Sequence, residues 1–266
     1  MIKGAVLGSP INHSLSPRLH SAIFEYLDIE GRYEAIEVKS GELADFFEQR
    51  SSEFDYLSLT MPLKEEALSL DVSVDEISQR IQSANTLIKS EEGWTLSSTD
   101  GSGFLQALAH KNLTSFSSVL ILGAGGTARA VAGALDSVSS SITVLGRTST
   151  REQALSNAIS EADFTYRIWD QSIDFRQFDL VVNTTPAGAA DLLAENLHGE
   201  ISVPLFDVIY KPWPTVLAAR WIDCGGMVLN GLELLLYQGI DQVEKVVGEI
   251  SDRDAMASHL RSILLR

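Results

Sequence analysis

Cysteine is almost absent from this chain of 266 residues, and that scarcity narrows the possible chemistry. Its single cysteine, Cys224, excludes an intrachain disulfide and any metal site built from several thiolates, and we expect a buried structural thiol. Histidines at metal-binding spacing such as H-E-x-x-H are also lacking. The sequence therefore predicts no metal site. The histidines are His13, His20, His110, His198 and His259.

Positive charge and long apolar runs are scarce as well. The formal net charge of −16 argues against nucleic acid or an anionic membrane as the main partner, while a small anionic substrate stays possible if binding groups gather at one spot. The opening stretch MIKGAVLGSP is too short and broken for a signal peptide, and no apolar run approaches a membrane span. No G-x-S-x-G elbow supports serine hydrolysis. We expect a cytoplasmic protein.

What the chain does have is a regular alternation of short apolar strands and helical patterns. This alternation is typical of α/β proteins with largely parallel sheets. We expect two α/β units with a boundary near residue 103, and the C-terminal helices could pack back on the first unit. Expected strands are Lys3–Gly8, Tyr33–Val38, Asp55–Thr60, a hairpin around Gly93, Val119–Gly123, Ile142–Gly146, Asp179–Thr184 and Pro204–Tyr210, and the long late helix is Asn230–Gly248.

A glycine cluster follows the strand that begins at Val119. Gly123, Gly125 and Ala128 fill the pattern G-x-G-x-x-[GA] between a strand and a small-residue helix. In this pattern the first glycine permits a tight turn, the second lets backbone approach a pyrophosphate, and the small third residue lets the helix sit close to the strand. The stretch predicts a doubly wound dinucleotide-binding unit. The alternative is a tight turn with no ligand.

The end of the next strand indicates which dinucleotide is bound. An acid about 20 residues after the glycines would hydrogen-bond the ribose of NAD, but VLGRTSTR offers none. Arg147, Thr148 and Arg151 lie there instead, and arginine matches phosphate oxygens. NADP is therefore favoured over NAD, with a solvated basic loop as the alternative.

Three stretches of the first unit point to a substrate site. Ser14 and Ser16 can both face one point before a helix, where Ser16 is expected to act as N-cap, and two hydroxyls there could cradle a carboxylate. Lys64 falls in the first turn of a helix, where the dipole disfavours a cation and where Glu65 and Glu66 already satisfy the turn. The alternatives are an ordinary cap and a solvated lysine.

The third stretch is split between SANTLI and SSTDGSG. Asn85 and Asp100 stand at the two ends of the expected hairpin and should be close in space if its strands pair. An amide and a carboxylate converging on Lys64 suit a small polyhydroxylated molecule. Alone, either residue could be an ordinary loop amide or helix cap.

Taken together, these stretches resemble the shikimate dehydrogenases over nearly the whole chain. SPINHSLSPRLH is similar to the family's H-S-x-S-P segment, LTMPLKEEA to its T-x-P-x-K segment, and ANT and TDG to its two polar motifs. GAGGTAR and RTSTR resemble its NADP loop and arginine clamp. NTTPAG, DVIYKPWPT and NGLELLLYQG occur in order after them.

The resemblance implies reversible reduction of 3-dehydroshikimate to shikimate with NADPH, an oxidoreductase step of chorismate and aromatic amino acid biosynthesis. It implies a substrate-binding domain of residues 1–102, completed by helices at about 238–266, an NADP-binding Rossmann domain of residues 103–237, and an active site in the cleft between them. Lys64 and Asp100 would be the catalytic pair. Ser14, Ser16, Thr60 and Tyr210 would bind the substrate carboxylate, and Asn85 and Gln238 the ring hydroxyls. Cofactor contacts would come from Gly123, Ala124, Gly125, Gly126, Thr127, Ala128, Arg147, Thr148, Arg151, Thr184, Val208, Gly231 and Leu234.

Several positions depart from the family pattern. Ser58-Leu59 and Ser98 replace residues common in the substrate motifs, Gly146 replaces the asparagine before the clamp arginine, and Leu234 stands for a common methionine. These departures leave open a quinate/shikimate dehydrogenase with partial NAD use. A non-catalytic NADP-binding sensor on the same scaffold is an alternative from a different class. The expected partners are a small-molecule substrate and the cofactor, in a monomer or homodimer.

Overall fold

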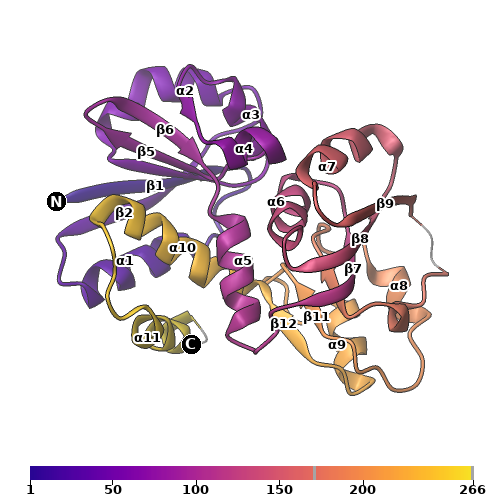
Figure 1. The fold of residues 1–266 in the computed structure, drawn as a ribbon. Helices are drawn as coiled ribbons and strands as arrows, with labels where there is room; N and C mark the ends of the chain where they lie inside the picture. The colour runs from indigo at the N-terminus through magenta and orange to yellow at the C-terminus, as the bar shows by residue number, and fades with distance from the viewer. Residues whose placement is uncertain (170–171, 265–266) are drawn as a thin grey trace. The chain divides into compact units, whose positions relative to one another are not determined.

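The computed structural model describes residues 1–169 and 172–264. The chain forms two compact units, Met1–Gly103 with Leu235–Arg266, and Phe104–Leu234. It passes from one unit to the other inside helix α5 (Asp100–Ala109) and inside helix α10 (Gly231–Val247). Figure 1 labels the elements of each unit along the chain.

The first unit is built on a mixed six-stranded sheet in the order β2-β1-β3-β5-β6-β4. Strand β1 pairs in parallel with β2 and β3, whereas β5 and β6 form an antiparallel hairpin that turns at Gly93. The hairpin is the one that the sequence predicts, and it makes the sheet less uniformly parallel than expected. The elements of this unit outside α5 and α10 are β1 (Ile2–Gly8), α1 (Ser16–Tyr26), β2 (Gly31–Glu37), α2 (Leu43–Arg50), β3 (Tyr56–Leu59), α3 (Leu63–Glu66), β4 (Ser73–Val74), α4 (Glu76–Ile81), β5 (Thr86–Ser90), β6 (Gly93–Ser97) and α11 (Arg253–Leu264).

Helices from both ends of the chain pack on this sheet. Figure 1 shows the C-terminal helices α10 and α11, in yellow, beside α1. The side chain of Arg18 in α1 donates to the backbone carbonyl of Ile263 in α11 at 2.6 Å, and the rings of Tyr26 and His259 lie 5.3 Å apart. The last helix therefore belongs to the first unit through direct contacts, although the whole second unit lies between α1 and α11 in the sequence.

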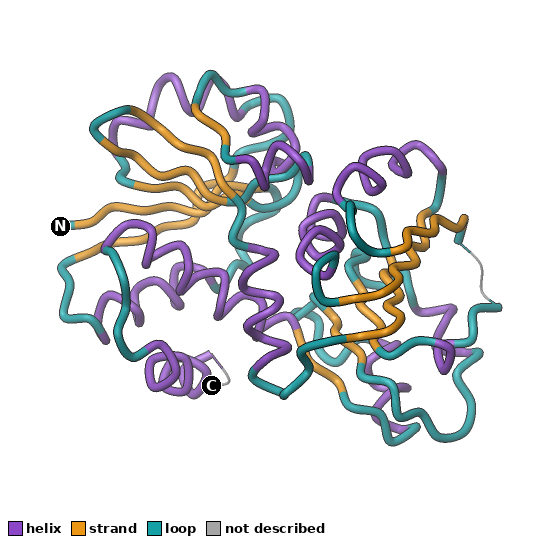
Figure 2. The backbone as a smooth tube through the Cα atoms, viewed as in Figure 1, coloured by secondary structure: helices purple, strands orange, loops and turns teal. Residues whose placement is uncertain are grey.

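The second unit contains a six-stranded parallel sheet in the order β12-β11-β10-β7-β8-β9. Figure 2 shows these strands in orange with helices beside them. The order runs outward from β7 in both directions, which is the doubly wound arrangement that the glycine pattern predicts. The elements are β7 (Phe116–Leu122), α6 (Gly126–Leu135), β8 (Ser139–Gly146), α7 (Glu152–Ala158), β9 (Asp163–Ile168), β10 (Leu180–Asn183), α8 (Asp191–Glu195), β11 (Leu205–Asp207), α9 (Val216–Asp223) and β12 (Val228–Asn230).

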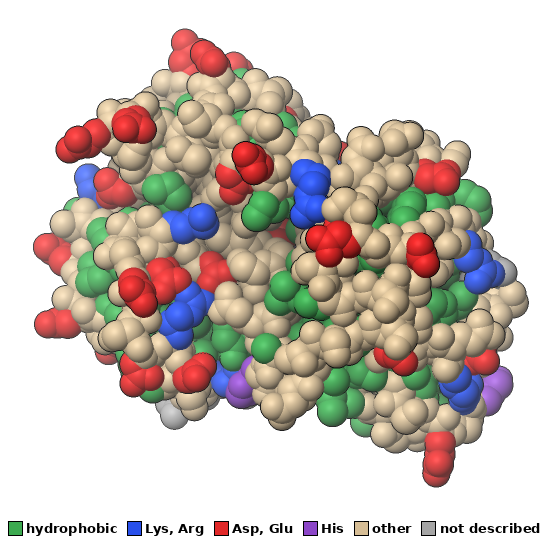
Figure 3. All heavy atoms as spheres, in the orientation of Figure 1, with side chains coloured by type: hydrophobic (Ala, Val, Ile, Leu, Met, Phe, Trp, Pro, Cys, Tyr) green, Lys and Arg blue, Asp and Glu red, His purple; other side chains and the backbone are tan. Residues whose placement is uncertain are grey.

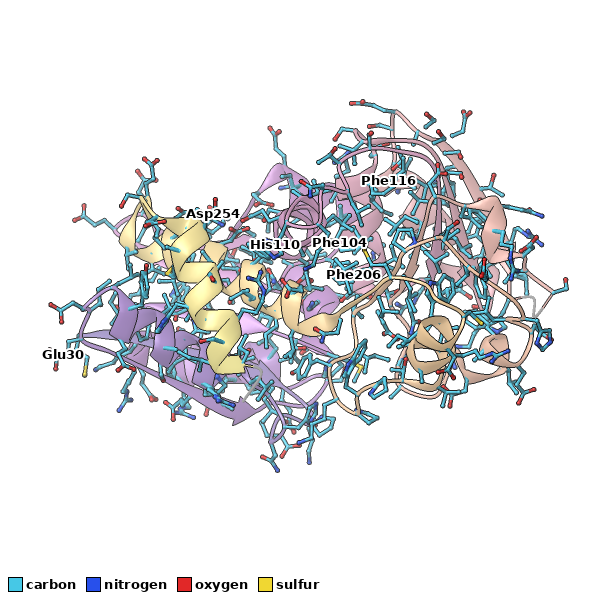
Figure 4. The ribbon with its side chains drawn as sticks, turned by 90° about the horizontal axis from the view of Figure 1, so that it is seen from below. Glu30, Phe104, His110, Phe116, Phe206 and Asp254 are labelled. Atoms are coloured by element: carbon cyan, nitrogen blue, oxygen red, sulfur yellow. The ribbon has the colours of Figure 1, made fainter. Side chains whose placement is uncertain are left out.

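The central strands β7, β10 and β11 are apolar and mostly buried, as expected where both faces of a parallel sheet are covered. Val119, Leu120 and Leu122 of β7 are fully buried. Figure 4 labels Phe104 of α5 and Phe206 of β11, whose ring centroids lie 4.8 Å apart within this unit. Cys224 is free and packs in a core cluster of this unit, which confirms the expected buried thiol.

Two local predictions need correction. Ser16 is the first residue of α1 rather than its N-cap, which is Leu15, and the hydroxyl of Ser14 accepts the backbone N–H of Ser16 at 3.3 Å. The predicted strand Pro204–Tyr210 is regular only over Leu205–Asp207. The Asp207 side chain accepts the N–H of Ile209 at 3.1 Å, and this local hydrogen bond turns the chain out of the sheet.

On the face drawn in Figure 3, red carboxylate side chains are scattered rather than gathered in one patch. Within the described residues, no helix has the length and apolar character needed to cross a membrane. In the same part of the chain, no three metal-ligating side chains come together.

Candidate functional site

The predicted substrate residues of the first unit gather at one edge of its sheet. β1 and β3 are parallel, so their carboxyl ends share an edge, and the antiparallel strand β5 begins there because Ser58 pairs with Thr86. β6 ends opposite the start of β5, where Thr86 pairs with Ser97. The segments that leave from this edge carry Ser14, Thr60 and Asn85 in loops, Lys64 in α3 and Asp100 at the start of α5.

Lys64 and Asp100 form a direct ion pair at this edge. Nζ of Lys64 donates to Oδ2 of Asp100 at 2.5 Å, with 17% of the lysine side chain and 5% of the aspartate side chain exposed. The backbone carbonyl of Lys64 accepts the N–H of Ala84 at 2.9 Å, which ties α3 to the segment before β5. A partly exposed cation held by a buried carboxylate can give a proton to an oxygen atom that approaches it.

The dipole argument for Lys64 does not hold. Helix α3 has only four residues, so its dipole is small. The carboxylate of Glu66 is also directed to the start of α2 rather than to the N–H groups of its own helix. The Glu66 carboxylate accepts the backbone N–H groups of Gly41 at 2.9 Å and Leu43 at 3.1 Å, which fixes the start of α2. The lysine is placed by its contact with Asp100 and not by the balance of charge within its helix.

Asn85 orients the aspartate of this pair. Its Nδ2 donates to Oδ1 of Asp100 at 2.9 Å and approaches Oε1 of Gln238 at 3.3 Å, while its Oδ1 accepts the N–H of Thr99 at 2.8 Å. Only 2% of Asn85 is exposed, against 8% of Gln238. The structure therefore brings together Lys64, Asp100, Asn85 and Gln238, as their motifs predict.

Asn85 is connected to a buried network of hydrogen-bonded side chains that sequence reasoning missed. Gln242 of α10 donates from Nε2 to the carbonyl of Asn85 at 3.1 Å and to Oγ1 of Thr86 at 2.9 Å. Its Oε1 accepts from the hydroxyl of Ser58 at 2.8 Å, and Ser58 in turn accepts from Tyr33 at 2.5 Å. Gln242 stands four residues after Gln238, and this spacing on one helix face is the signal that could have found it.

A buried histidine lies at the end of this hydrogen-bond network that is farthest from Asn85. His20 stacks on Tyr33 with ring centroids 3.9 Å apart, and its Nδ1 lies 2.7 Å from the hydroxyl of Tyr56. Burial lowers the pKa of His20 to about 3, and Gln242 offsets only part of that effect. Burial also raises the pKa of Tyr33 and Tyr56. These groups are all neutral at neutral pH, so they act as fixed hydrogen-bonding groups.

Of the hydroxyl groups predicted for carboxylate binding, those of Ser14, Ser16 and Thr60 lie on the same edge in separate segments. Ser14 and Ser16 are joined by the hydrogen bond at the start of α1. Thr60 follows β3, and its N–H donates to Leu7 of β1 at 2.9 Å. A Cβ at Gly8 would lie only 2.8 Å from the Met61 carbonyl, so this glycine permits the close approach of the two segments.

In the second unit, the predicted cofactor residues follow the carboxyl ends of parallel strands. Gly123 after β7 has φ +105°, and a Cβ there would lie 2.6 Å from Oγ1 of Thr184 after β10. Gly231 after β12 packs on the backbone of Val208 after β11, where a Cβ would lie 2.5 Å from the Val208 carbonyl carbon. Gly123 and Thr184 stand where strand order reverses, between β7 and β10, which is where nucleotides bind in sheets of this type.

The start of α6 has the features that phosphate-binding helix starts share. Gly125 is the N-cap and offers no side-chain acceptor to the first helical N–H groups, and Ala128 is fully buried against the strand. Gly126 and Thr127 open the helix after Ala124. These features fit a dinucleotide pyrophosphate.

The arginine segment lies beside this turn. Arg147 and Thr148 follow β8 and are exposed, and Nη1 of Arg151 donates to the carbonyl of Ala124 at 3.3 Å. The structure thus joins the predicted clamp to the glycine turn. Two further predicted residues lie in the described loops and helices of this unit: Tyr210 is half-buried and Leu234 is buried.

A second buried polar group supports the loops at this edge and was not predicted. Asp207 accepts from the hydroxyl of Thr215 at 2.7 Å and from Nδ2 of Asn183 at 3.1 Å. Asn183 accepts from the hydroxyl of Thr185 at 2.7 Å. Burial raises the pKa of Asp207, and these donors oppose that rise. The residues lie in NTTPAG and DVIYKPWPT, so those motifs hold both loops in place.

Two family models match the chain. The model described as shikimate dehydrogenase substrate binding domain matches residues 6–87, and the model described as shikimate / quinate 5-dehydrogenase matches residues 107–202. The shikimate dehydrogenase (NADP(+)) of Methanosarcina mazei is 36% identical over 251 residues, which cover 89% of each chain.

Solved structures of similar proteins have the same fold. The Mycobacterium tuberculosis shikimate dehydrogenase matches with a TM-score of 0.88 and 34% identity, over 98% of this chain and 100% of that one. The Thermus thermophilus shikimate 5-dehydrogenase in complex with NADP(H) and shikimate matches with a TM-score of 0.84 and 33% identity, over 99% and 100%. These matches confirm the predicted fold class and family. The chain belongs to the shikimate dehydrogenase family.

Proposed function

We propose that this chain catalyses the reversible, NADP-dependent reduction of 3-dehydroshikimate to shikimate, with Lys64 and Asp100 as the acid-base pair. The observation that carries the proposal is the ion pair of 2.5 Å between Nζ of Lys64 and Oδ2 of Asp100, placed at the sheet edge where the predicted substrate residues gather. Membership of a family of NADP-dependent shikimate dehydrogenases supports both substrate and cofactor.

The proton chemistry follows from this pair. NADPH supplies the hydride when it is bound. As the ring ketone becomes an alkoxide, the ammonium of Lys64 stabilises the developing charge and gives it a proton. Asp100 holds Nζ in place with Oδ2, while its Oδ1 accepts from Asn85. In the oxidation direction the lysine takes the proton back.

Binding of the substrate is assigned to the hydroxyls at the same edge and to one residue of the second unit. Ser14, Ser16, Thr60 and Tyr210 would bind the carboxylate, and uncharged donors suit this task because they add no cation beside Lys64. Gln238 would bind a ring hydroxyl. Asn85 is 2% exposed and its amide is engaged with Asp100, so we assign it mainly to orienting the aspartate.

The cofactor is assigned to the carboxyl edge of the second sheet. Backbone N–H groups at Gly125, Gly126 and Thr127 would receive the pyrophosphate, and Arg147, Thr148 and Arg151 the 2′-phosphate. Thr184, Val208, Gly231 and Leu234 would line the nicotinamide side. The close approaches of Gly123 to Thr184 and of Gly231 to Val208 support this assignment.

The remaining expectations concern assembly and place in the cell. We propose that the chain works as a monomer or homodimer in the cytoplasm. A lone buried cysteine, Cys224, suits a reducing compartment because it forms no structural disulfide within the chain. Light scattering on purified protein and fractionation of cells would test these two points.

The test is the rate of NADP reduction with shikimate, run beside quinate and NAD. We expect turnover with shikimate and NADP, and Lys64→Ala should lower kcat by about 10²-fold or more. Lys89→Ala is the matched control, because Lys89 is exposed on β5 and should keep its rate. Both variants should keep the wild-type circular dichroism spectrum.

Three results would contradict the proposal in different ways. Near-normal kcat in folded Lys64→Ala would remove the lysine from the mechanism. Preference for quinate or NAD would favour the broader quinate/shikimate activity. Binding of NADPH without turnover of any of these substrates would favour a sensor.

A further inference from the structure

A tyrosine of the neighbouring strand occupies the space beside Gly146, at the end of β8. A Cβ built on Gly146 would lie 2.6 Å from Cζ of Tyr166 in β9, and closer still to its hydroxyl oxygen. The φ of Gly146 lies outside the left-handed region, so the backbone itself would accept any residue. Glycine is required here only because the phenol needs the space.

The phenol holds the segment that carries the arginines. The Tyr166 hydroxyl donates to the backbone carbonyl of Thr148 at 2.5 Å. Thr148 is extended, lies directly after Arg147 and precedes the short 3₁₀ turn Ser149–Arg151. Burial and the charge of Glu152 raise the pKa of Tyr166 against the opposing effect of Arg151, so the hydroxyl remains a proton donor at neutral pH.

The same segment is fastened at its other end. Arg151 donates to the carbonyl of Ala124 in the glycine turn at 3.3 Å. Without these two contacts the exposed segment would move easily, because a loop with few buried contacts opens at little cost. A planar guanidinium binds a phosphate best when its position is fixed in advance.

We propose that Tyr166 is a positioning residue for recognition of the 2′-phosphate of NADP(H). It acts on the segment 147–151 through its hydrogen bond to Thr148. Gly146 leaves the space that the tyrosine ring occupies. The inference rests on the proposed function, in which this segment binds the 2′-phosphate. A purely structural tyrosine would stabilise the edge of the sheet and leave the preference between the two cofactors unchanged.

The experiment compares direct binding of NADPH and NADH to the full chain, by fluorescence titration. Tyr166→Phe removes the hydroxyl and keeps the ring. The dissociation constant of NADPH should rise about fivefold, the effect expected for one lost hydrogen bond, while that of NADH should not change. Tyr26→Phe is the matched control, because Tyr26 lies in α1 of the other unit and should leave both constants unchanged.

A second variant, Gly146→Ala, tests the same interaction from the other residue of the pair. Gly146→Ala should displace the phenol and weaken NADPH selectively. The double variant Gly146→Ala/Tyr166→Phe should bind NADPH about as weakly as Gly146→Ala alone, because both changes remove one interaction. Additive losses, equal losses for NADPH and NADH, or unchanged NADPH binding by both single variants would overturn the inference. Shikimate oxidation is measured separately, so failure of the proposed function is distinguishable.

Discussion

The buried amide of Gln242 offers a sharp test of how the first unit fixes its catalytic pair. The substitution Gln242→Met keeps the length and volume of the side chain but removes every hydrogen bond that it makes. Only 1% of Gln242 is exposed, so water cannot replace those bonds without rearrangement. The residue touches neither Lys64 nor Asp100 in the network described, and it acts on them through Asn85.

The expected loss of stability can be worked out from the partners. The Asn85 carbonyl keeps the N–H of Leu59 at 2.8 Å, and Thr86 keeps Oδ1 of Asn85 at 2.8 Å. The hydroxyl of Ser58, in contrast, loses the acceptor of its proton, at about 1–3 kcal/mol for a buried orphan donor. The two lost donations add about 0.5–1.5 kcal/mol each, so the total is about 2–6 kcal/mol.

Hydrogen exchange followed by mass spectrometry is the suitable assay, because it resolves peptides of each unit. We expect faster exchange in the first unit, a reduced kcat and an unchanged affinity for NADPH. Gln49→Met is the control: Gln49 is exposed on α2, and a surface change there should stay within about 0.5 kcal/mol. A loss below about 1 kcal/mol for Gln242→Met would refute the assignment of these bonds, and so would unchanged kcat.

Two further predictions concern the second unit. Gly123→Ala forces a side chain onto a φ of +105° and toward Thr184, so NADPH affinity should fall about tenfold in the same titration. Burial alone would raise the pKa of Asp136, but donors from residues 160–162 outweigh it and lower that pKa. Its stabilisation is therefore present above the unfolded carboxyl pKa and is lost as pH falls through the folded value. Urea unfolding midpoints at pH 7 and pH 3 should differ less in Asp136→Asn, which should cost about 2–4 kcal/mol at pH 7.

The parts of the fold that could be predicted are those whose signals are local. Apolar runs that end in glycine or polar loops indicate strands β7, β8 and β10. A glycine between two stretches of alternating apolar and polar residues indicates the hairpin. Elements such as β9 and α4 were not predicted. Both elements mix exposed polar residues with buried or partly buried ones, so neither has a clear hydrophobic pattern. The order of β9 is evident only from its pairing with β8, and that of α4 from its aspartate N-cap.

The candidate site divides in the same way. Lys64, Asn85 and Asp100 lie in short polar motifs, and strand pairing brings those motifs to one edge, so the sequence could predict their meeting. Tyr33 could not be found, because a tyrosine in a strand is ordinary. The spacing from Gln238 places Gln242 on the same helix face, but the sequence does not show which buried groups its amide meets. Their role depends on which buried atom each one faces, and that is decided by tertiary packing.

Two glycines show why departures from a family pattern must be interpreted together with their neighbours in space. Gly123 is required by its own backbone angle, so the sequence pattern alone identifies it. The backbone angle of Gly146 does not require glycine. In the sequence, Gly146 is evident only as the loss of the asparagine side chain that the family pattern has before the clamp arginine. The structure shows a phenol from the next strand in that space, with its hydroxyl on Thr148. Tyr166 therefore fills the place that a side chain at residue 146 would take, which argues that this chain retains NADP recognition by a different pair of residues.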